Sequence, residues 1–114
     1  MTLADFLQHI KNDNSVSFSQ TLAVIEENYH YHPTAFRNGT LDNAAGQNEG
    51  SCKIFAFAQL HALTQQQTLN CFGDYYRVDV LAHPDASDHQ NIRQFMQNSW
   101  PGIAFEHANT LTAK

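Results

Sequence analysis

Basic residues are scarce in this chain of 114 residues, and so are long apolar runs. Six Lys and Arg face eleven Asp and Glu, which gives a formal net charge of −5. Affinity for DNA or RNA depends on cations that neutralise phosphates, so this balance argues against a nucleic-acid partner. It argues equally against docking on an anionic membrane. No apolar segment approaches the ~20 residues of a transmembrane helix.

Cysteine is scarce as well, with only Cys52 and Cys71. The N-terminal residues lack the basic start and the apolar core of a secretory signal. We therefore expect free thiols in a reducing, cytosolic environment, while export without signal cleavage stays open. The length suits one domain over residues 1–114, and 42% apolar residues suffice for a core without disulfides or a structural metal.

Helical spacing of apolar residues predicts a mainly α fold, a compact bundle of about five helices. The segment 51–63 is apolar around most of its circumference, which predicts a central, buried helix with Ser51 as its N-cap. Gly73 is expected where two helices cross closely. Residues 12–15 are expected to break the chain after the first helix. In chain order, the expected helices cover residues 3–10, about 17–29, 51–63, 64–80 and 88–100.

Residues 33–50 form a long Asn- and Gly-rich segment between two predicted helices. Long ordered loops in small domains are often functional. Within this one, Asn38-Gly39 between Phe36 and Leu41 predicts a tiny β-hairpin. We expect the loop to be ordered and held against the helices by its asparagines, by Glu49 and by a guanidinium group. Farther on, Ile103 and Phe105 alternate in a short extended tail.

An ordered set of short motifs runs from the loop to the C-terminal half. The motifs are Pro33-Thr34-Ala35-Phe36 with Asn38-Gly39, Asn48-Glu49-Gly50-Ser51-Cys52-Lys53-Ile54-Phe55, Thr68-Leu69, Cys71-Phe72-Gly73-Asp74-Tyr75-Tyr76-Arg77, Asp79-Val80-Leu81 and His89-Gln90-Asn91-Ile92-Arg93. On these residues the sequence resembles the HopJ type III effector family over nearly its whole length. The resemblance implies a soluble bacterial protein, either cytoplasmic or delivered by a type III secretion system. It implies no particular reaction.

Cys52 is the sharpest candidate for chemistry, because it lies at the predicted start of the central helix. The partial positive charge of a helix N-terminus stabilises a thiolate and an oxyanion. His89 is the candidate base and Glu49 the third member of this catalytic set. The competing interpretation is structural, since a free Cys is usually a small buried hydrophobe. We expect burial to prevail and Cys52 to react slowly.

Polar residues of the same motifs are candidates for ligand binding. Arg77 and Asp79 are two residues apart, so on a helix they diverge and each should reach another element. A guanidinium group suits a carboxylate or phosphate, although structural ion pairs are the commoner use. Both interpretations stay open for the candidate set, which comprises Asn38, Asn48, Lys53, Arg77, Asp79 and Arg93.

Seven histidines raise the question of a metal site, which the spacing argues against. Pairs of the His-x-x-x-His or Cys-x-x-Cys type are absent. His30 and His32 have a spacing that suits a strand, but we place them at a helix end. No metal or cofactor is therefore expected.

The predicted function is binding of a host or bacterial protein, or of a small ligand, with no defined biochemical activity. One alternative is a small cysteine-dependent hydrolase or acyltransferase that uses Cys52. Another is a purely structural or interaction module. Geometry separates them, because an enzyme needs its thiol exposed in a cleft within reach of an imidazole. The sequence gives no indication of the oligomeric state.

Overall fold

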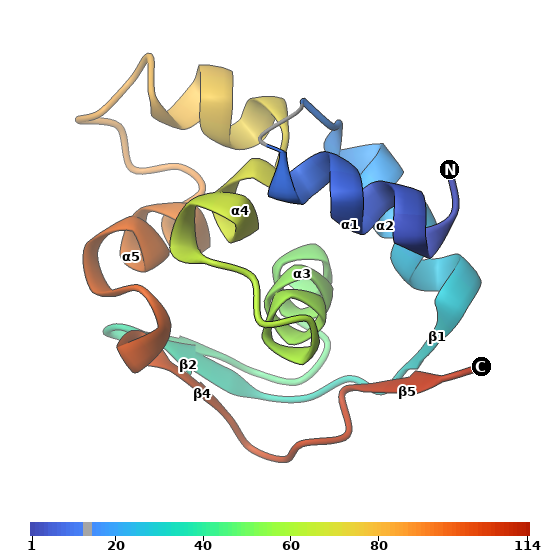
Figure 1. Ribbon diagram of the computed structural model, residues 1–114. Coiled ribbons are helices and arrows are strands. Elements are labelled where there is room, and N and C mark those ends of the chain that lie inside the picture. Colours follow the sequence, from blue (N-terminus) through green and yellow to red (C-terminus); the bar gives the residue numbers. More distant parts are fainter. Residues whose placement is uncertain (13–14) are drawn as a thin grey trace.

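A single helix, α3 (Glu49–Leu60), forms the centre of the molecule in the computed structural model, which describes residues 1–12 and 15–114. Figure 1 looks almost along its axis and shows the other elements arranged around it. Six of its twelve residues are buried, from Cys52 to Ala58. The prediction of a central helix is thus confirmed, although its N-cap is Asn48 rather than Ser51.

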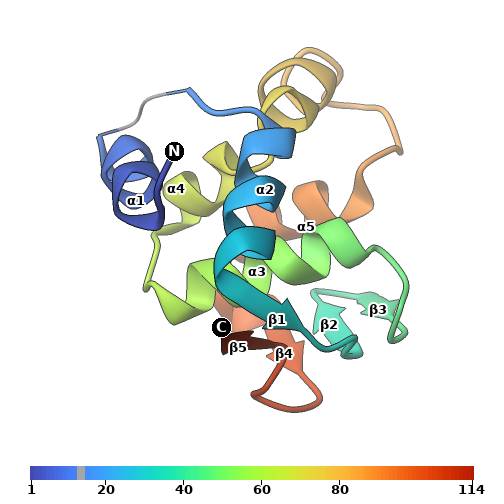
Figure 2. The same cartoon turned by 90° about the vertical axis from the view of Figure 1, so that its right-hand side faces the viewer.

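Two N-terminal helices cover one side of α3. They are α1 (Leu3–Lys11) and α2 (Phe18–Asn28). The Thr2 hydroxyl accepts a hydrogen bond from the backbone N–H of Asp5 at the start of α1, and Ser17 and Gln20 form a reciprocal capping box on α2. The predicted break at residues 12–15 lies partly outside the described residues. Figure 2 shows α2 crossing α3 and running on toward the sheet below it.

The helix predicted over 64–80 is divided by a turn. A capping box of Thr64 and Gln67 starts α4 (Gln65–Asn70), and a π-helix, η1 (Tyr75–Val80), follows. Gly73 separates them with a φ of +63°, a left-handed conformation that ends a helix. A Cβ on Gly73 would lie 2.6 Å from the backbone nitrogen of Phe18, so the predicted close crossing is confirmed.

The fifth predicted helix is present as α5 (Gln90–Asn98). Its N-cap is His89, one residue beyond the predicted Asp88. A 3₁₀ turn, η2 (Trp100–Gly102), follows and contains the expected Pro101 stop.

The prediction of a mainly α fold is wrong, because about 51% of the chain is helix and 13% is strand. One sheet pairs β1 (Tyr29–Tyr31) with β5 (Leu111–Ala113) in antiparallel register. The other places β2 (Phe36–Asn38) between β3 (Leu41–Asn43) and β4 (Ile103–Phe105), also antiparallel. The predicted hairpin is therefore real, but both sheets also recruit the C-terminal tail, a pairing that three-residue strands do not reveal in sequence.

Aromatic rings from several elements meet on α3. The Phe57 ring is fully buried and lies edge-on to Phe6, with 5.8 Å between the ring centres. Phe55 packs against Phe95 of α5 at 4.9 Å. The hydrophobic core is thus continuous from α1 to α5 through α3. Among the helices described, none is long and apolar enough to cross a membrane.

Truncating Phe57 should destabilise the whole domain. We expect Phe57→Ala to lower the free energy of unfolding by about 3–5 kcal/mol, because the cavity cannot collapse inside a core packed on all sides. Thermal or urea unfolding measures this change. Leu60 is the matched control on the same helix, since it is 54% exposed; Leu60→Ala should change stability by about 0.5 kcal/mol or less. Equal losses for the two variants would contradict the central position of α3.

Candidate functional site

Four asparagine side chains form a hydrogen-bonded cluster beneath the N-termini of α3 and α5. Asn38 donates from Nδ2 to the backbone oxygen and the Oδ1 of Asn91, at 2.7 and 3.0 Å. Asn43 and Asn91 exchange two side-chain hydrogen bonds of 3.1 and 3.0 Å. Asn48 donates to Oδ1 of Asn43 at 2.7 Å. Asn38, Asn43 and Asn91 are buried, so these bonds form out of water and are costly to break.

This asparagine cluster joins three parts of the chain. Asn38 and Asn43 belong to the β2–β3 hairpin, Asn48 is the N-cap of α3, and Asn91 lies in the first turn of α5. The expectation that asparagines hold the long loop is confirmed. The guanidinium group within the loop, Arg37, only bridges β2 to β3 through Asp42.

A cleft of about 390 Å³ opens above the cluster, between the starts of α3 and α5. Its walls combine aromatic rings with backbone at two helix N-termini. The lining residues are Phe18, Leu41, Asn48, Gly50, Ser51, Phe72, Tyr75, His89, Gln90, Asn91 and Ile92.

Both helices present free backbone N–H groups to this cleft. The N-cap residues Asn48 and His89 have φ angles of 50° and 51°, and neither side chain caps its own helix. The first helical hydrogen bond of α3 is donated by Cys52, so Gly50 and Ser51 precede it. Along the described chain, no other group accepts from these N–H groups or from those of Gln90 and Asn91. Such N–H groups attract negative charge.

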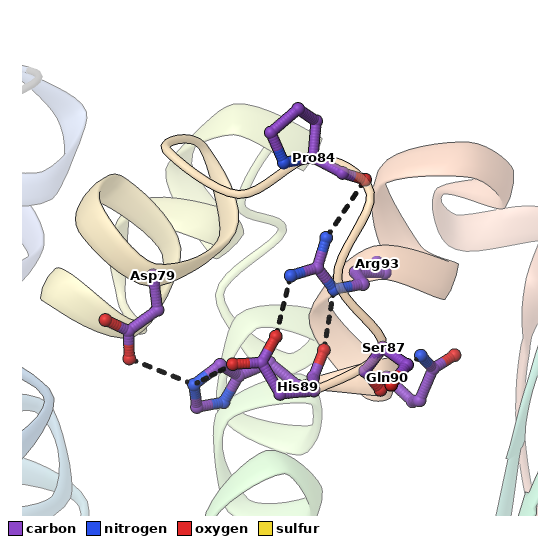
Figure 3. A network of polar contacts seen from close by, with 7 residues as sticks. Asp79, Pro84, Ser87, His89, Gln90 and Arg93 are labelled. Carbon is purple, nitrogen blue, oxygen red and sulfur yellow. Dashed lines mark hydrogen bonds and ion pairs between the residues drawn. The ribbon is translucent and has the colours of Figure 1, made fainter.

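His89 forms the far wall of the cleft and is fixed on two sides. Its Nε2 lies 3.0 Å from Oδ2 of Asp79 and 3.8 Å from Oδ2 of Asp88 (Figure 3). Its ring stacks on Tyr75 with 5.0 Å between ring centres. The structure therefore brings together two predicted site residues, His89 and Asp79, and adds Tyr75, which sequence reasoning had assigned mostly to the core.

Arg93 fixes the loop that precedes α5. Its guanidinium donates to the backbone oxygen and Oδ1 of Asp88, at 2.6 and 2.7 Å, and to the backbone oxygen of Pro84 (Figure 3). The hydrogen bonds from Arg93 lower the pKa of Asp88 below its ordinary value. Only 11% of the Arg93 side chain is exposed, so its charge is directed inward.

Arg77 likewise serves a contact within the fold. Its Nη2 donates to the backbone oxygen of Val16 at 2.7 Å and lies 3.4 Å from Asp74. This bond ties η1 to the residues before α2. Arg77 and Asp79 thus reach different elements, as their spacing predicted.

Cys52 lies beside the cleft but does not line it. The side chain is 1% exposed, and its thiol donates to the backbone oxygen of Thr34 at 3.5 Å. Burial raises the pKa of the thiol and Glu49 adds to the increase, while Tyr31, Thr34 and Lys53 act in the opposite direction. Ser51 takes the position in the cleft instead, because successive helical side chains diverge by about 100°.

Glu49 and Lys53 surround Tyr31 rather than a ligand cleft. Lys53 Nζ lies 4.8 Å from the centre of the Tyr31 ring and 3.6 Å from Oε1 of Glu26. Burial raises the pKa of Tyr31, and Cys52 and Glu49 raise it further. The structure thus groups Cys52 with Glu49 and Lys53. Over the described residues, no contact joins Cys52 to His89.

The histidines do not assemble a metal site. His30 lies in strand β1, not at a helix end as expected, and His32 follows the strand, where its Nε2 is 3.1 Å from Oγ1 of Thr112. Residues 1–12 and 15–114 contain no group of three His, Cys, Asp or Glu that could hold a metal ion.

Sequence reasoning missed most of the cleft wall. Phe18 had been placed only on the apolar face of its helix, and Ser51 only as an N-cap. Gly50 was the available signal, because a Cβ there would lie 2.6 Å from the Phe18 ring. Only glycine allows that approach of α3 to α2.

Comparison with known proteins identifies the chain's relatives. Residues 3–110 match the family described as HopJ type III effector protein. A crystal structure titled as the unknown function protein VPA0580 is 52% identical, with a TM-score of 0.96 over 100% of this chain and 95% of that one. No curated protein matches significantly.

The asparagine cluster should contribute measurably to stability. Asn91→Ala removes one acceptor and one donor from buried partners, so we expect unfolding to become easier by about 1–3 kcal/mol. Gln97→Ala on the exposed side of the same helix is the control. Urea unfolding of the two variants measures the difference, and a loss for Asn91→Ala no larger than for Gln97→Ala would refute the role of the cluster.

Cys52 should resist a mild thiol reagent at neutral pH. Both cysteines are free and buried, and burial raises the pKa of Cys71 to about 12. In a Cys71→Ser variant, the remaining thiol reports Cys52 alone. We expect slow labelling of the native variant and fast labelling in denaturant, because the raised pKa of Cys52 leaves little thiolate. Fast native labelling that His89→Asn abolishes would instead indicate an activated nucleophile.

Proposed function

Because the chain belongs to the HopJ type III effector protein family, we propose that it is an effector-type protein that acts by binding. The proposed site is the cleft between α3 and α5. The observation that carries this proposal is the convergence of two uncapped helix N-termini on one cleft of ligand size.

The proposed ligand is a small molecule with an anionic group and a planar ring. The N–H groups of Gly50, Ser51, Gln90 and Asn91 suit a carboxylate or phosphate. Tyr75 is 43% exposed and offers a ring face beside them. The nearest carboxylates already have partners, because Asp79 bonds to His89 and Asp88 bonds to Arg93.

Binding is favoured over catalysis by the state of the candidate nucleophiles. Cys52 is buried with a raised pKa and lies outside the cleft. Ser51 and His89 both line the cleft, but the imidazole Nε2 bonds to Asp79 and, within the described chain, no hydrogen bond joins the Ser51 hydroxyl to the ring. An activated nucleophile requires that hydrogen bond.

Titration of ¹⁵N-labelled protein with inorganic phosphate and with phenyl phosphate tests the proposal. We expect the amide signals of Gly50, Ser51, Gln90 and Asn91 to shift with both probes. Phenyl phosphate should bind more tightly because its ring can stack on Tyr75. Tyr75→Ala should weaken phenyl phosphate about tenfold and leave inorganic phosphate unchanged, since stacking is worth ~1–3 kcal/mol.

Leu60→Ala is the control, because Leu60 is exposed on the same helix but outside the cleft. It should leave both affinities unchanged. Shifts spread over the whole surface, or equal weakening of both probes by Tyr75→Ala, would refute an anion-and-ring site in the cleft.

A further inference from the structure

A second surface, separate from the cleft, exposes apolar side chains on η1 and α5. Among the described residues, six large apolar side chains are exposed, and four of them belong to these elements or their caps. Val78 is 52% exposed and Leu81 is 50% exposed. The four are Tyr75, Val78, Leu81 and Met96. In Figure 1 the segment that contains η1, coloured yellow to orange, stands at the edge of the molecule.

A groove of about 310 Å³ runs between η1 and α5 at this edge. Leu81, Pro84 and Ala86 line one side, and Met96 lies on the other. Every residue from Leu81 to Asp88 is exposed, so the covering material of an ordinary core is missing here. The groove has the size and lining to accept a large apolar side chain.

The rim of the groove is acidic. Residues 74–88 hold four carboxylates, on Asp74, Asp79, Asp85 and Asp88, but only one guanidinium group. That group, Arg77, donates inward to the backbone of Val16. The nearby Arg93 is also turned inward, onto Asp88 and Pro84. The outer face therefore presents carboxylates and apolar side chains while its cations are used within the fold.

We propose that this groove docks a basic amphipathic segment of a partner protein. Large apolar side chains of the segment would enter between Leu81 and Met96, and its Lys or Arg side chains would face the aspartates. Charge complementarity of this kind steers association and selects the partner's sign. A membrane fits less well, because anionic lipids repel the carboxylates. A second copy fits less well for the same reason, since it brings a like-charged rim.

A designed peptide tests the groove without knowledge of the natural partner. The probe is a fluorescent helical peptide with Leu at i, i+3 and i+4 spacing and Lys elsewhere, and the reference carries Glu in place of Lys. We expect fluorescence anisotropy to show binding of the Lys peptide only, weakened by added salt. Leu81→Ser should weaken it about tenfold, because few contacts at the centre of an interface carry most of the affinity. Asp85→Asn should weaken it severalfold and reduce the salt dependence.

Leu60→Ser is the matched control, since Leu60 is as exposed as Leu81 but lies outside the groove. It should bind the Lys peptide like the unmodified chain, and circular dichroism should show all variants folded. The proposal is overturned if the Lys peptide does not bind, or if the Glu peptide binds equally. It is also overturned if Leu60→Ser weakens binding as much as Leu81→Ser. Dimerisation in sedimentation, or adhesion to anionic vesicles, that Leu81→Ser abolishes would assign the groove to another occupant.

Discussion

Hydrogen bonds among buried asparagines determine where the two helix N-termini lie. Asn91 carries four of these bonds between its side chain and backbone oxygen, and through them it contacts Asn38 and Asn43. Asn48 attaches α3 to the same group. An amide both donates and accepts, so four of them can satisfy one another in a way that four hydroxyls or carboxylates cannot. The cluster carries no charge, which avoids the cost of burying ions.

The cleft follows from this arrangement. Each helix starts at a residue in the left-handed region, Asn48 or His89, whose side chain is engaged elsewhere. Asn48 is used in the asparagine cluster and His89 is used by Asp79, so neither satisfies the N–H groups of its own helix. The free N–H groups are therefore a direct consequence of how the helices are anchored. Aromatic rings from α2 and η1 then enclose the space.

Local signals predicted what depends on local contacts. The caps at Ser17 and Thr64, the hairpin at Gly39 and the buried ring of Phe57 were all readable from spacing and residue type. Pairings between distant segments were not. Strand β1 joins β5 across about eighty residues of sequence, and three-residue strands show too little alternation to predict it.

The candidate site shows the same limit at the level of single residues. A helix start was predicted near Cys52, but the face that each residue presents depends on where α3 begins. Moving the N-cap from Ser51 to Asn48 leaves Ser51 in the cleft and Cys52 beneath Thr34. The asparagines were noticed as loop residues, yet nothing in the sequence pairs Asn91 with Asn43.

The cleft and the groove lie on opposite sides of one short segment. Gln90 lines both, and the loop before it is held by His89 on the cleft side and by Arg93 on the groove side. Substitutions at Gln90 or Arg93 would therefore disturb the two sites together. Tyr75 lines only the cleft and Leu81 only the groove. The anchored segment gives both sites a shared wall, while each keeps an exposed side chain of its own through which it can be altered separately.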